Sequence, residues 1–186
     1  MKIVLTPNKV LTGQAKPVGK IDNKIRQIIK EMKKVLFESE IGVGLAAPQV
    51  GFPYRLFIAA PDLVNYKKRK KAKYYVFINP EIVPVKENKQ AAGTSSGGPT
   101  LEGCLSIPNI WGKVARKEKA TLTYLDEFGK KWTKTFTGLL AIIIQHEMDH
   151  LRGVLFTHHV CSQGHKLYKQ VLDRKSGKYV MEEVEI

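Results

Sequence analysis

The sequence predicts an α+β fold in which antiparallel β-sheets pack around a central buried helix. Strand-like segments rich in aromatic and β-branched residues lie at 54–60, 74–79, 120–126 and 131–136. A polar turn at 127–130 joins the last two into a hairpin. A helix expected over about 138–152 is almost wholly apolar in its first two turns, which places it in the core rather than on the surface.

Length and composition fit one globular domain. Of 186 residues, 43% are hydrophobic and 26% are charged, which excludes wholesale disorder. Only two cysteines occur, so a secreted disulfide scaffold is not expected. The longest apolar run, at 139–144, is far shorter than the ~20 residues that span a bilayer, and the apolar start of the chain breaks at Pro7. We therefore expect a cytoplasmic protein with no membrane partner.

Charge is the unusual bulk property. Lys and Arg total 31 against 17 Asp and Glu, a net charge of +14 that favours encounter with nucleic acid or ribosomes. The excess is concentrated at 67–73 (KKRKKAK), and such runs usually form solvated loops, with RNA contact or nuclear targeting as the alternatives. The sequence thus predicts a basic loop over 62–73.

The first clear element is an amphipathic helix. Apolar residues from Ile25 to Leu36 recur on one face of a 3.6-residue period, and Asp22 is a suitable N-cap. After it, residues 42–49 (GVGLAAPQ) predict irregular backbone that another group approaches closely.

The remaining segments complete a single domain over 1–186. Residues 81–86 predict an edge strand because they contain Pro84. Residues 86–100 are rich in Gly and Ser and predict a flexible loop within the domain. Thr137 is a fitting N-cap for the buried helix, which Gly153 would end. From about 162 a polar C-terminal tail is expected, with a last strand at 179–184.

The buried helix carries the pattern HExxH. His146 and His150 lie one turn apart on one face, which is the spacing that two imidazoles need to share a metal ion. Glu147 can then act as a general base beside the ion. Incidental histidines on a surface helix are the plainer interpretation, but polar groups at the end of a core helix need partners. Metal-assisted hydrolysis is therefore favoured.

The helix motif leaves the third ligand open. A metzincin would place a histidine where Phe156 stands, which excludes that class. His158 and His159 miss that position and are expected to be solvated at a strand end. Asp149 is expected to pair with a cation such as Arg116 and to orient the site rather than to bind the metal.

Cys104 is the remaining candidate. A cysteine without a disulfide is usually inert core, which is the interpretation kept for Cys161, but His₂Cys plus water completes a four-coordinate catalytic site. Three alternatives remain at this point: an HExxH peptidase using Glu182 or Glu183, a Cys–His nucleophile pair, and a basic RNA- or ribosome-binding module without catalysis.

Three segments resemble, in order and spacing, the signature motifs of the peptide deformylases: 42–49 (GVGLAAPQ), 102–106 (EGCLS) and 145–150 (QHEMDH). The similarity extends over about residues 3–156, and because it begins so near the start of the chain no transit peptide is expected. The resemblance implies a hydrolase that removes the formyl group from the N-terminal formylmethionine of nascent polypeptides and releases formate.

The resemblance also implies roles for individual residues. The metal ligands would be Cys104, His146 and His150. The catalytic groups would be Glu147, the side-chain amide of Gln49 and the backbone N–H of Leu105. The substrate would be bound by Val43, Gly44, Glu102, Gly103, Ile142 and Ile143. Ile142 and Ile143 also follow from the helix itself, because residues four and three positions before His146 share its face.

The implied cofactor is one divalent ion, with ferrous iron favoured and zinc, nickel or cobalt able to occupy the same ligands. The implied partners are N-formylmethionyl peptides and nascent chains. Association with the ribosome is compatible with the charge of +14, and no specific DNA partner is expected.

Overall fold

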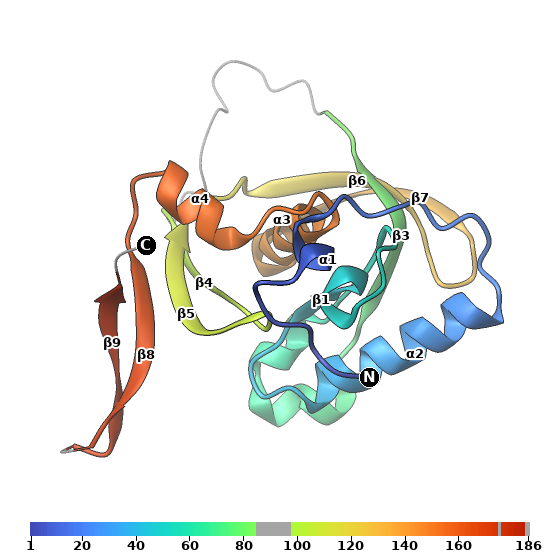
Figure 1. The fold of residues 1–186 in the computed structure, drawn as a ribbon. Coiled ribbons are helices and arrows are strands. Elements are labelled where there is room, and N and C mark those ends of the chain that lie inside the picture. The colour runs from blue at the N-terminus through green and yellow to red at the C-terminus, as the bar shows by residue number, and fades with distance from the viewer. Residues whose placement is uncertain (85–97, 175, 185–186) are drawn as a thin grey trace.

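The computed structural model describes residues 1–84, 98–174 and 176–184 (Figure 1). Its helices are α1 (Lys9–Thr12), α2 (Asn23–Glu38), η1 (Ala47–Val50), η2 (Pro61–Val64), η3 (Tyr66–Lys71), α3 (Gly138–Leu151) and α4 (Phe156–Ser162). Its strands are β1 (Gly44–Ala46), β2 (Leu56–Ala59), β3 (Tyr75–Ile82), β4 (Thr100–Cys104), β5 (Ile107–Val114), β6 (Lys119–Leu125), β7 (Lys131–Thr137), β8 (Leu167–Asp173) and β9 (Lys178–Val184). In the described ranges, no helix combines the length and the apolar character needed to cross a membrane.

The strands form two antiparallel sheets. One has five strands in the order β1-β2-β3-β6-β7, and the other has four in the order β4-β5-β8-β9. Figure 1 shows α3 in the middle of the molecule, with α2 along one side and the β8–β9 hairpin projecting from the other. The α+β class with a central buried helix is confirmed.

Alternation along β2 explains how one sheet is covered on both faces. Leu56 and Ile58 join the core cluster that contains α2, whereas Phe57 and Ala59 join the cluster that contains α3. The predicted helix with Asp22 as N-cap is confirmed, because the Asp22 carboxylate accepts a hydrogen bond from the backbone N–H of Ile25. The apolar face of α2 is buried as the period requires.

The predicted buried helix and the hairpin before it are confirmed as α3 and as β6 with β7. Thr137 occupies the N-cap position of α3, although its side chain makes no capping hydrogen bond. Gly153 lies just beyond the helix with φ 74°, where an added Cβ would meet the Thr12 carbonyl oxygen. A glycine is therefore required at this point of the chain.

Two predictions around the first sheet are wrong. A separate strand does not begin at Glu81, because β3 continues to Ile82 through a bulge between Ile78 and Glu81; of the predicted range, residues 85 and 86 lie outside the described residues. Asn79, with φ 49°, makes this bend, and its side chain forms two hydrogen bonds to the backbone of Val18. Residues 42–49 are not irregular throughout, because β1 pairs with β2 before η1 begins.

The basic run also differs from a plain loop. Residues 66–71 form η3, and the Asn65 side chain accepts a hydrogen bond from Lys67 N at its start. The Arg69 guanidinium donates to the carbonyl oxygens of Ser39, Glu40 and Leu63, which fixes this helix to the end of α2.

The C-terminal part contains more regular structure than the sequence predicts. The expected strand at 179–184 is confirmed as β9, whereas its partner β8 is not predicted. His158 and His159 do not lie at a strand end, since they belong to the short helix α4. Of the flexible loop predicted at 86–100, residues 86–97 lie outside the described ranges, and Thr100 already belongs to β4.

Candidate metal centre

Strand β4 and helix α3 bring together three side chains that could bind a metal ion. Cys104 ends β4, and His146 and His150 lie one turn apart on α3. One donor atom of each residue lies within 4.8 Å of the other two, and Cys104 Sγ is 3.2 Å from His150 Nε2. All three side chains are buried or nearly so. A thiolate and two imidazoles at these separations are a suitable donor set for one divalent ion.

Gln49 is held beside the thiol with a fixed orientation. Its Oε1 accepts a hydrogen bond from the backbone N–H of Ala46 at 2.8 Å. The amide nitrogen therefore faces the site, where Nε2 lies 3.4 Å from both Cys104 Sγ and Ser106 Oγ. The short helix η1 thus presents an N–H donor next to the three ligands.

Glu102 orients one of the ligands through a buried ion pair. Its Oε2 is 2.9 Å from His146 Nδ1, and both of its oxygens accept hydrogen bonds from Arg116. Because a carboxylate only accepts, Nδ1 is the donor, and Nε2 of His146 is left as the ligand atom. Burial alone would raise the pKa of Glu102, but the bonds from Arg116 and His146 outweigh it and lower the pKa to about 2.

The Arg116 guanidinium also contacts Asp149, near the end of the HExxH motif on α3. Arg116 Nη1 donates to Asp149 Oδ2, so the expected pairing of Asp149 with Arg116 is confirmed. His159 Nε2 lies 2.9 Å from the same oxygen. A continuous chain of polar contacts therefore runs from His146 through Arg116 to the half-buried His159 on α4.

Glu147 lies in a confined space without a hydrogen-bond partner for one oxygen. Its side chain is 3% exposed, and Oε2 has no partner among the described residues. A Cβ added to Gly44 on β1 would stand 2.3 Å from Glu147 Oε1, so only glycine allows the strand to pass this close. Burial raises the pKa of Glu147 to about 7, which suits a group that exchanges protons near neutrality.

The donor set fits a divalent ion electrostatically. Burial and the neighbouring His146 lower the pKa of His150, which keeps that imidazole neutral as a ligand must be. Burial also opposes a charge on His146, but hydrogen bonds with Cys104 and Glu102 outweigh it and raise its pKa. A cation bound at Nε2 would replace the proton on the side of the thiol, while Nδ1–H continues to donate to Glu102.

A mostly apolar cavity of about 300 Å³ opens beside these residues. Its inner wall includes His146, Glu147, Ile142 and Ile143 of α3. Its exposed apolar rim is formed by Ile41, Val64, Leu101 and Leu139. The site therefore adjoins a hollow able to take an apolar side chain.

The N-terminal segment holds the three motifs together. Val4 N donates to Gln49 O, and Thr6 N donates to Ser106 O. Ala15 N donates to Leu151 O at the end of α3. The segment 4–15, which contains α1, is thus bonded to a residue in or beside each motif, although Gln49 and Leu151 lie about a hundred positions apart in the sequence.

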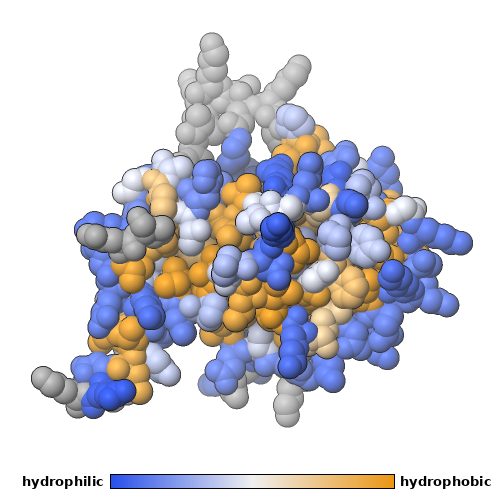
Figure 2. All heavy atoms as spheres, viewed as in Figure 1, coloured by the Kyte–Doolittle hydropathy of each residue, from blue (hydrophilic) through white to orange (hydrophobic). Residues whose placement is uncertain are grey.

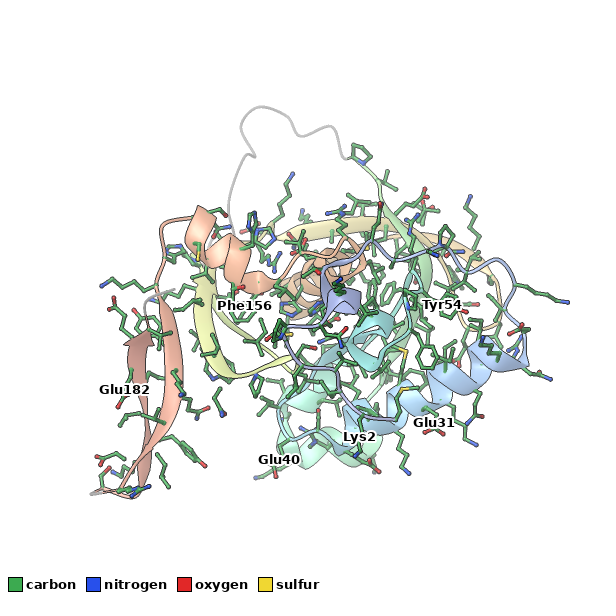
Figure 3. All side chains as sticks on the ribbon, viewed as in Figure 1. Lys2, Glu31, Glu40, Tyr54, Phe156 and Glu182 are labelled. Carbon is green, nitrogen blue, oxygen red and sulfur yellow. The ribbon has the colours of Figure 1, made fainter. Side chains whose placement is uncertain are left out.

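The structure places the residues expected from sequence around one centre. Lining the cavity are Val43, Gly44, Gln49, Glu102, Gly103, Cys104, Leu105, Ile142, Ile143, His146 and Glu147. His150 lies behind them, fully buried, in contact with Cys104. The carboxylate of Glu102 is engaged by Arg116 and His146, so its side chain supports a ligand. Figure 3 shows Glu182, the alternative ligand, on the projecting hairpin, whereas Phe156 lies at the start of α4 near the middle of the molecule.

Sequence reasoning missed three kinds of contact. They are the bond from Gln49 to Ser106, the pairing of Arg116 with Glu102, and the contact of His159 with Asp149, and each joins residues of different segments of the fold. Only the charges of Arg116 and Glu102 offered a signal, since buried ions need partners.

Comparison with known proteins decides the family. The family model described as polypeptide deformylase matches residues 1–166 of this chain. The chain belongs to the polypeptide deformylase family. The peptide deformylase of Chlorobaculum parvum is 38% identical over 88% of this chain and 81% of its own length. Peptide deformylase 2 of Clostridium acetobutylicum is 39% identical over 84% of this chain and 92% of its own length.

Solved deformylase structures share the fold. The Legionella pneumophila peptide deformylase is 38% identical, with a TM-score of 0.70, and the match covers 85% of this chain and 84% of that one. The Plasmodium falciparum peptide deformylase is 34% identical with a TM-score of 0.72, and 85% of each chain is covered. This chain is accordingly a metal-dependent hydrolase that removes the N-formyl group from nascent polypeptides.

Proposed function

We propose that Cys104, His146 and His150 hold one divalent ion and that the surrounding residues carry out deformylation. The observation that carries this proposal is the approach of Cys104, from β4, to both histidines of α3. When bound, the ion supplies Lewis-acid polarisation of the formyl group and of the attacking water. Glu102 holds His146 in the required tautomer through its 2.9 Å contact to Nδ1.

Glu147 moves the proton. Its buried carboxylate takes a proton from the water that attacks the formyl carbon, and it delivers that proton to the leaving α-amine as the C–N bond breaks. Formate and a free amino terminus result. A pKa raised to about 7 by burial fits both the acceptance and the return of the proton.

Gln49 and the backbone N–H of Leu105 stabilise the negative charge that develops on the formyl oxygen. The Gln49 amide is oriented in advance because its oxygen is bound by Ala46 N. Donors that are fixed before the reaction stabilise developing charge without any cost of reorganisation, and removal of one such donor typically lowers kcat about 10²–10³-fold.

The substrate is an N-formylmethionyl peptide. The apolar cavity beside Ile142 and Ile143 receives the methionine side chain, and the peptide runs along the backbone of Val43 and Gly44. The formyl carbon bears hydrogen where other acyl groups bear carbon, and the close approach of Gly44 to Glu147 leaves little room for a larger group.

Two finer assignments complete the proposal. The resident ion is ferrous iron, by resemblance to the family, and zinc, nickel or cobalt can occupy the same thiolate and imidazole donors. The enzyme acts on nascent chains in the cytoplasm, and its charge of +14 supports docking to ribosomes. Co-sedimentation with ribosomes in low salt, and its loss in high salt, checks the docking.

The test is formate release from a formyl-Met tripeptide under anaerobic conditions. We expect Glu147→Ala to lower turnover at least 10²-fold while the metal content is unchanged. Cys104→Ser should weaken metal binding, whereas Cys161→Ser, at an exposed position, is the matched control and should not. Full metal retention by Cys104→Ser would exclude this ligand set and favour a peptidase-like site.

A further inference from the structure

The β8–β9 hairpin lies beyond the part of the chain that the family model covers. The family model ends at residue 166, and the hairpin begins at Leu167. Figure 1 shows it projecting from the body of the molecule, and β9 is the outermost strand of the four-stranded sheet. Every residue of β9 before Val184 is exposed. One edge of β9 therefore carries backbone N–H and C=O groups that no strand of the described chain pairs.

Apolar side chains lie along this exposed hairpin. Leu172 is 53% exposed, and it stands directly opposite Tyr179, which is 68% exposed. Met181 lies two residues further on the same face, while Val180 and Val171 oppose each other on the other face. Figure 2 shows hydrophobic atoms along the projection, flanked by hydrophilic ones. An exposed apolar edge strand of this kind is a template for pairing with another strand.

We propose that β9 pairs in antiparallel fashion with β9 of a second copy of this chain, with Val180 of one copy opposite Val180 of the other. The pairing joins two four-stranded sheets into one continuous sheet of eight strands. The partner is identified by complementarity. When residues 178–182 (KYVME) pair with the same segment in the reverse direction, the lysine faces the glutamate and the tyrosine faces the methionine.

The register follows from the geometry of an antiparallel pair. Residues that face each other must both direct their N–H and C=O groups across the gap or both direct them away. Along one strand these directions alternate, so a strand that pairs with its own copy must be centred on a residue and not between two residues. The centres that keep at least five of the seven residues of β9 paired are Val180, Met181 and Glu182.

Only one of these centres matches the charges. With Val180 at the centre, Lys178 stands opposite Glu182 of the second copy, twice by symmetry, and Tyr179 stands opposite Met181. With Met181 at the centre, Glu182 would face Val180 and Glu183 would face Tyr179. With Glu182 at the centre, the two copies of Glu182 would face each other, which places like charges in contact. Opposite charges and aromatic–apolar contacts are the favourable cross-strand pairs.

The neighbouring strand extends this match. Within one copy, Asp173 opposes Lys178 and Lys169 opposes Glu182. Across four strands of the dimer, the row then reads Asp173, Lys178, Glu182 of the second copy and Lys169 of the second copy, so the sign of the charge alternates at each step. On the other face, Leu172, Tyr179 and Met181 of the second copy form one apolar row.

The first test is sedimentation velocity of the full-length chain over a range of concentrations in low salt. Wild type is expected to show a reversible monomer–dimer equilibrium in the micromolar range, as suits a contact limited to one strand edge. Lys178→Glu and Glu182→Lys each place like charges opposite each other at two positions, so each variant alone should dimerise at least tenfold more weakly. Lys30→Glu, at an exposed position of α2, makes the same charge change as Lys178→Glu away from the hairpin. This variant should dimerise as wild type does.

An equimolar mixture of Lys178→Glu and Glu182→Lys tests whether residue 178 of one copy faces residue 182 of the other. In a heterodimer, Glu at 178 faces Lys at 182, and Lys at 178 faces Glu at 182, so both pairs are opposite in sign again. We expect the mixture to regain dimers that neither variant forms alone. This recovery also shows that each variant hairpin is still folded.

A disulfide test reads the register directly. In a Cys161→Ser background, Val180→Cys places two sulfurs at the centre of the pair, where antiparallel Cα atoms are about 4.5–5.5 Å apart and a disulfide can form. Met181→Cys is the matched control, because the two copies of residue 181 are then diagonal neighbours about 7–8 Å apart. Dimer on a non-reducing gel should form with Val180→Cys and much less with Met181→Cys. A monomeric wild type, no recovery in the mixture, or equal cross-linking at both positions would each overturn the proposal.

Discussion

Replacing Glu102 with glutamine should weaken both the fold and the metal site. The carboxylate accepts hydrogen bonds from Arg116 Nε at 2.8 Å, from Arg116 Nη2 at 2.9 Å and from His146 Nδ1 at 2.9 Å. An amide of the same shape has one accepting oxygen, so its NH₂ group must face a donor. It also leaves the buried Arg116 with less negative charge beside it.

The pKa of Glu102 gives the magnitude. The fall in this pKa from 4.5 to about 2 corresponds to roughly 3 kcal/mol of stabilisation near neutral pH, since each pKa unit is worth about 1.4 kcal/mol. Because the pKa in the folded state lies below the unfolded value, this stabilisation is complete above about pH 6 and is lost as the pH falls through about 2. It should be reduced to about 2 kcal/mol near pH 3.5.

The assay is urea unfolding of the metal-free protein at several pH values, with Glu81→Gln as the matched control. Glu81 is 70% exposed and lies 3.8 Å from Arg55, so its loss should cost less than about 1 kcal/mol. Glu102→Gln should lower the free energy of unfolding by about 3 kcal/mol at neutral pH and by less at pH 3.5. Metal affinity, measured by competition with a chelator, should fall about 10–100-fold. A variant equal to wild type in both measurements would refute the support assigned to Glu102.

Four further predictions concern the site. Gly44→Ala would bring a Cβ within 2.3 Å of Glu147 Oε1, so kcat for formate release should fall at least tenfold while metal content is retained. Asp149→Asn removes the charge bound by Arg116 and His159, and chelator competition should show weaker metal binding with a smaller effect than Glu102→Gln. Acidification should lower kcat/KM, because Glu147 is then protonated and cannot accept a proton. Burial raises its pKa to about 7, and a cation bound nearby lowers the pH at which the activity falls. A pH profile in which kcat/KM does not fall on the acid side would contradict this role. Removal of the metal should lower Tm, because the ion binds the folded ligand set and not the unfolded chain, and an unchanged thermal scan would argue against binding at these residues.

Local patterns were sufficient for the main elements of the fold. The apolar periods of α2 and α3 and the alternation of β6 and β7 depend on residues a few positions apart, and each was predictable. By contrast, α4 (FTHHVCS) contains Thr157 and Val160, which have low helix propensity, and it forms because Phe156 and Val160 are buried against the second sheet. The bulge at Asn79 and the short strand β1 also depend on tertiary contacts.

The site residues likewise differ in whether local sequence could predict their proximity. His146 and His150 are separated by one helical turn, so their proximity follows from the sequence alone. Cys104 was a candidate because a thiolate would complete a four-coordinate site with the two histidines, but no local period relates it to α3, and the resemblance to a family was needed to exclude the alternatives. The bonds of Arg116 join the segment between β5 and β6 to Glu102 on β4 and to Asp149 on α3, and nothing in the neighbouring sequence of Arg116 specifies which carboxylates it meets.

The bonds made by Val4, Thr6 and Ala15 have a consequence for synthesis of the enzyme. These residues leave the ribosome well before their partners, and Leu151, the acceptor for Ala15, leaves it some 136 residues after Ala15. Until then the beginning of the chain has only part of its partners, and the histidines have not met the thiol. A fragment that ends before the third motif therefore lacks His146, Glu147 and His150, and we expect it to be inactive.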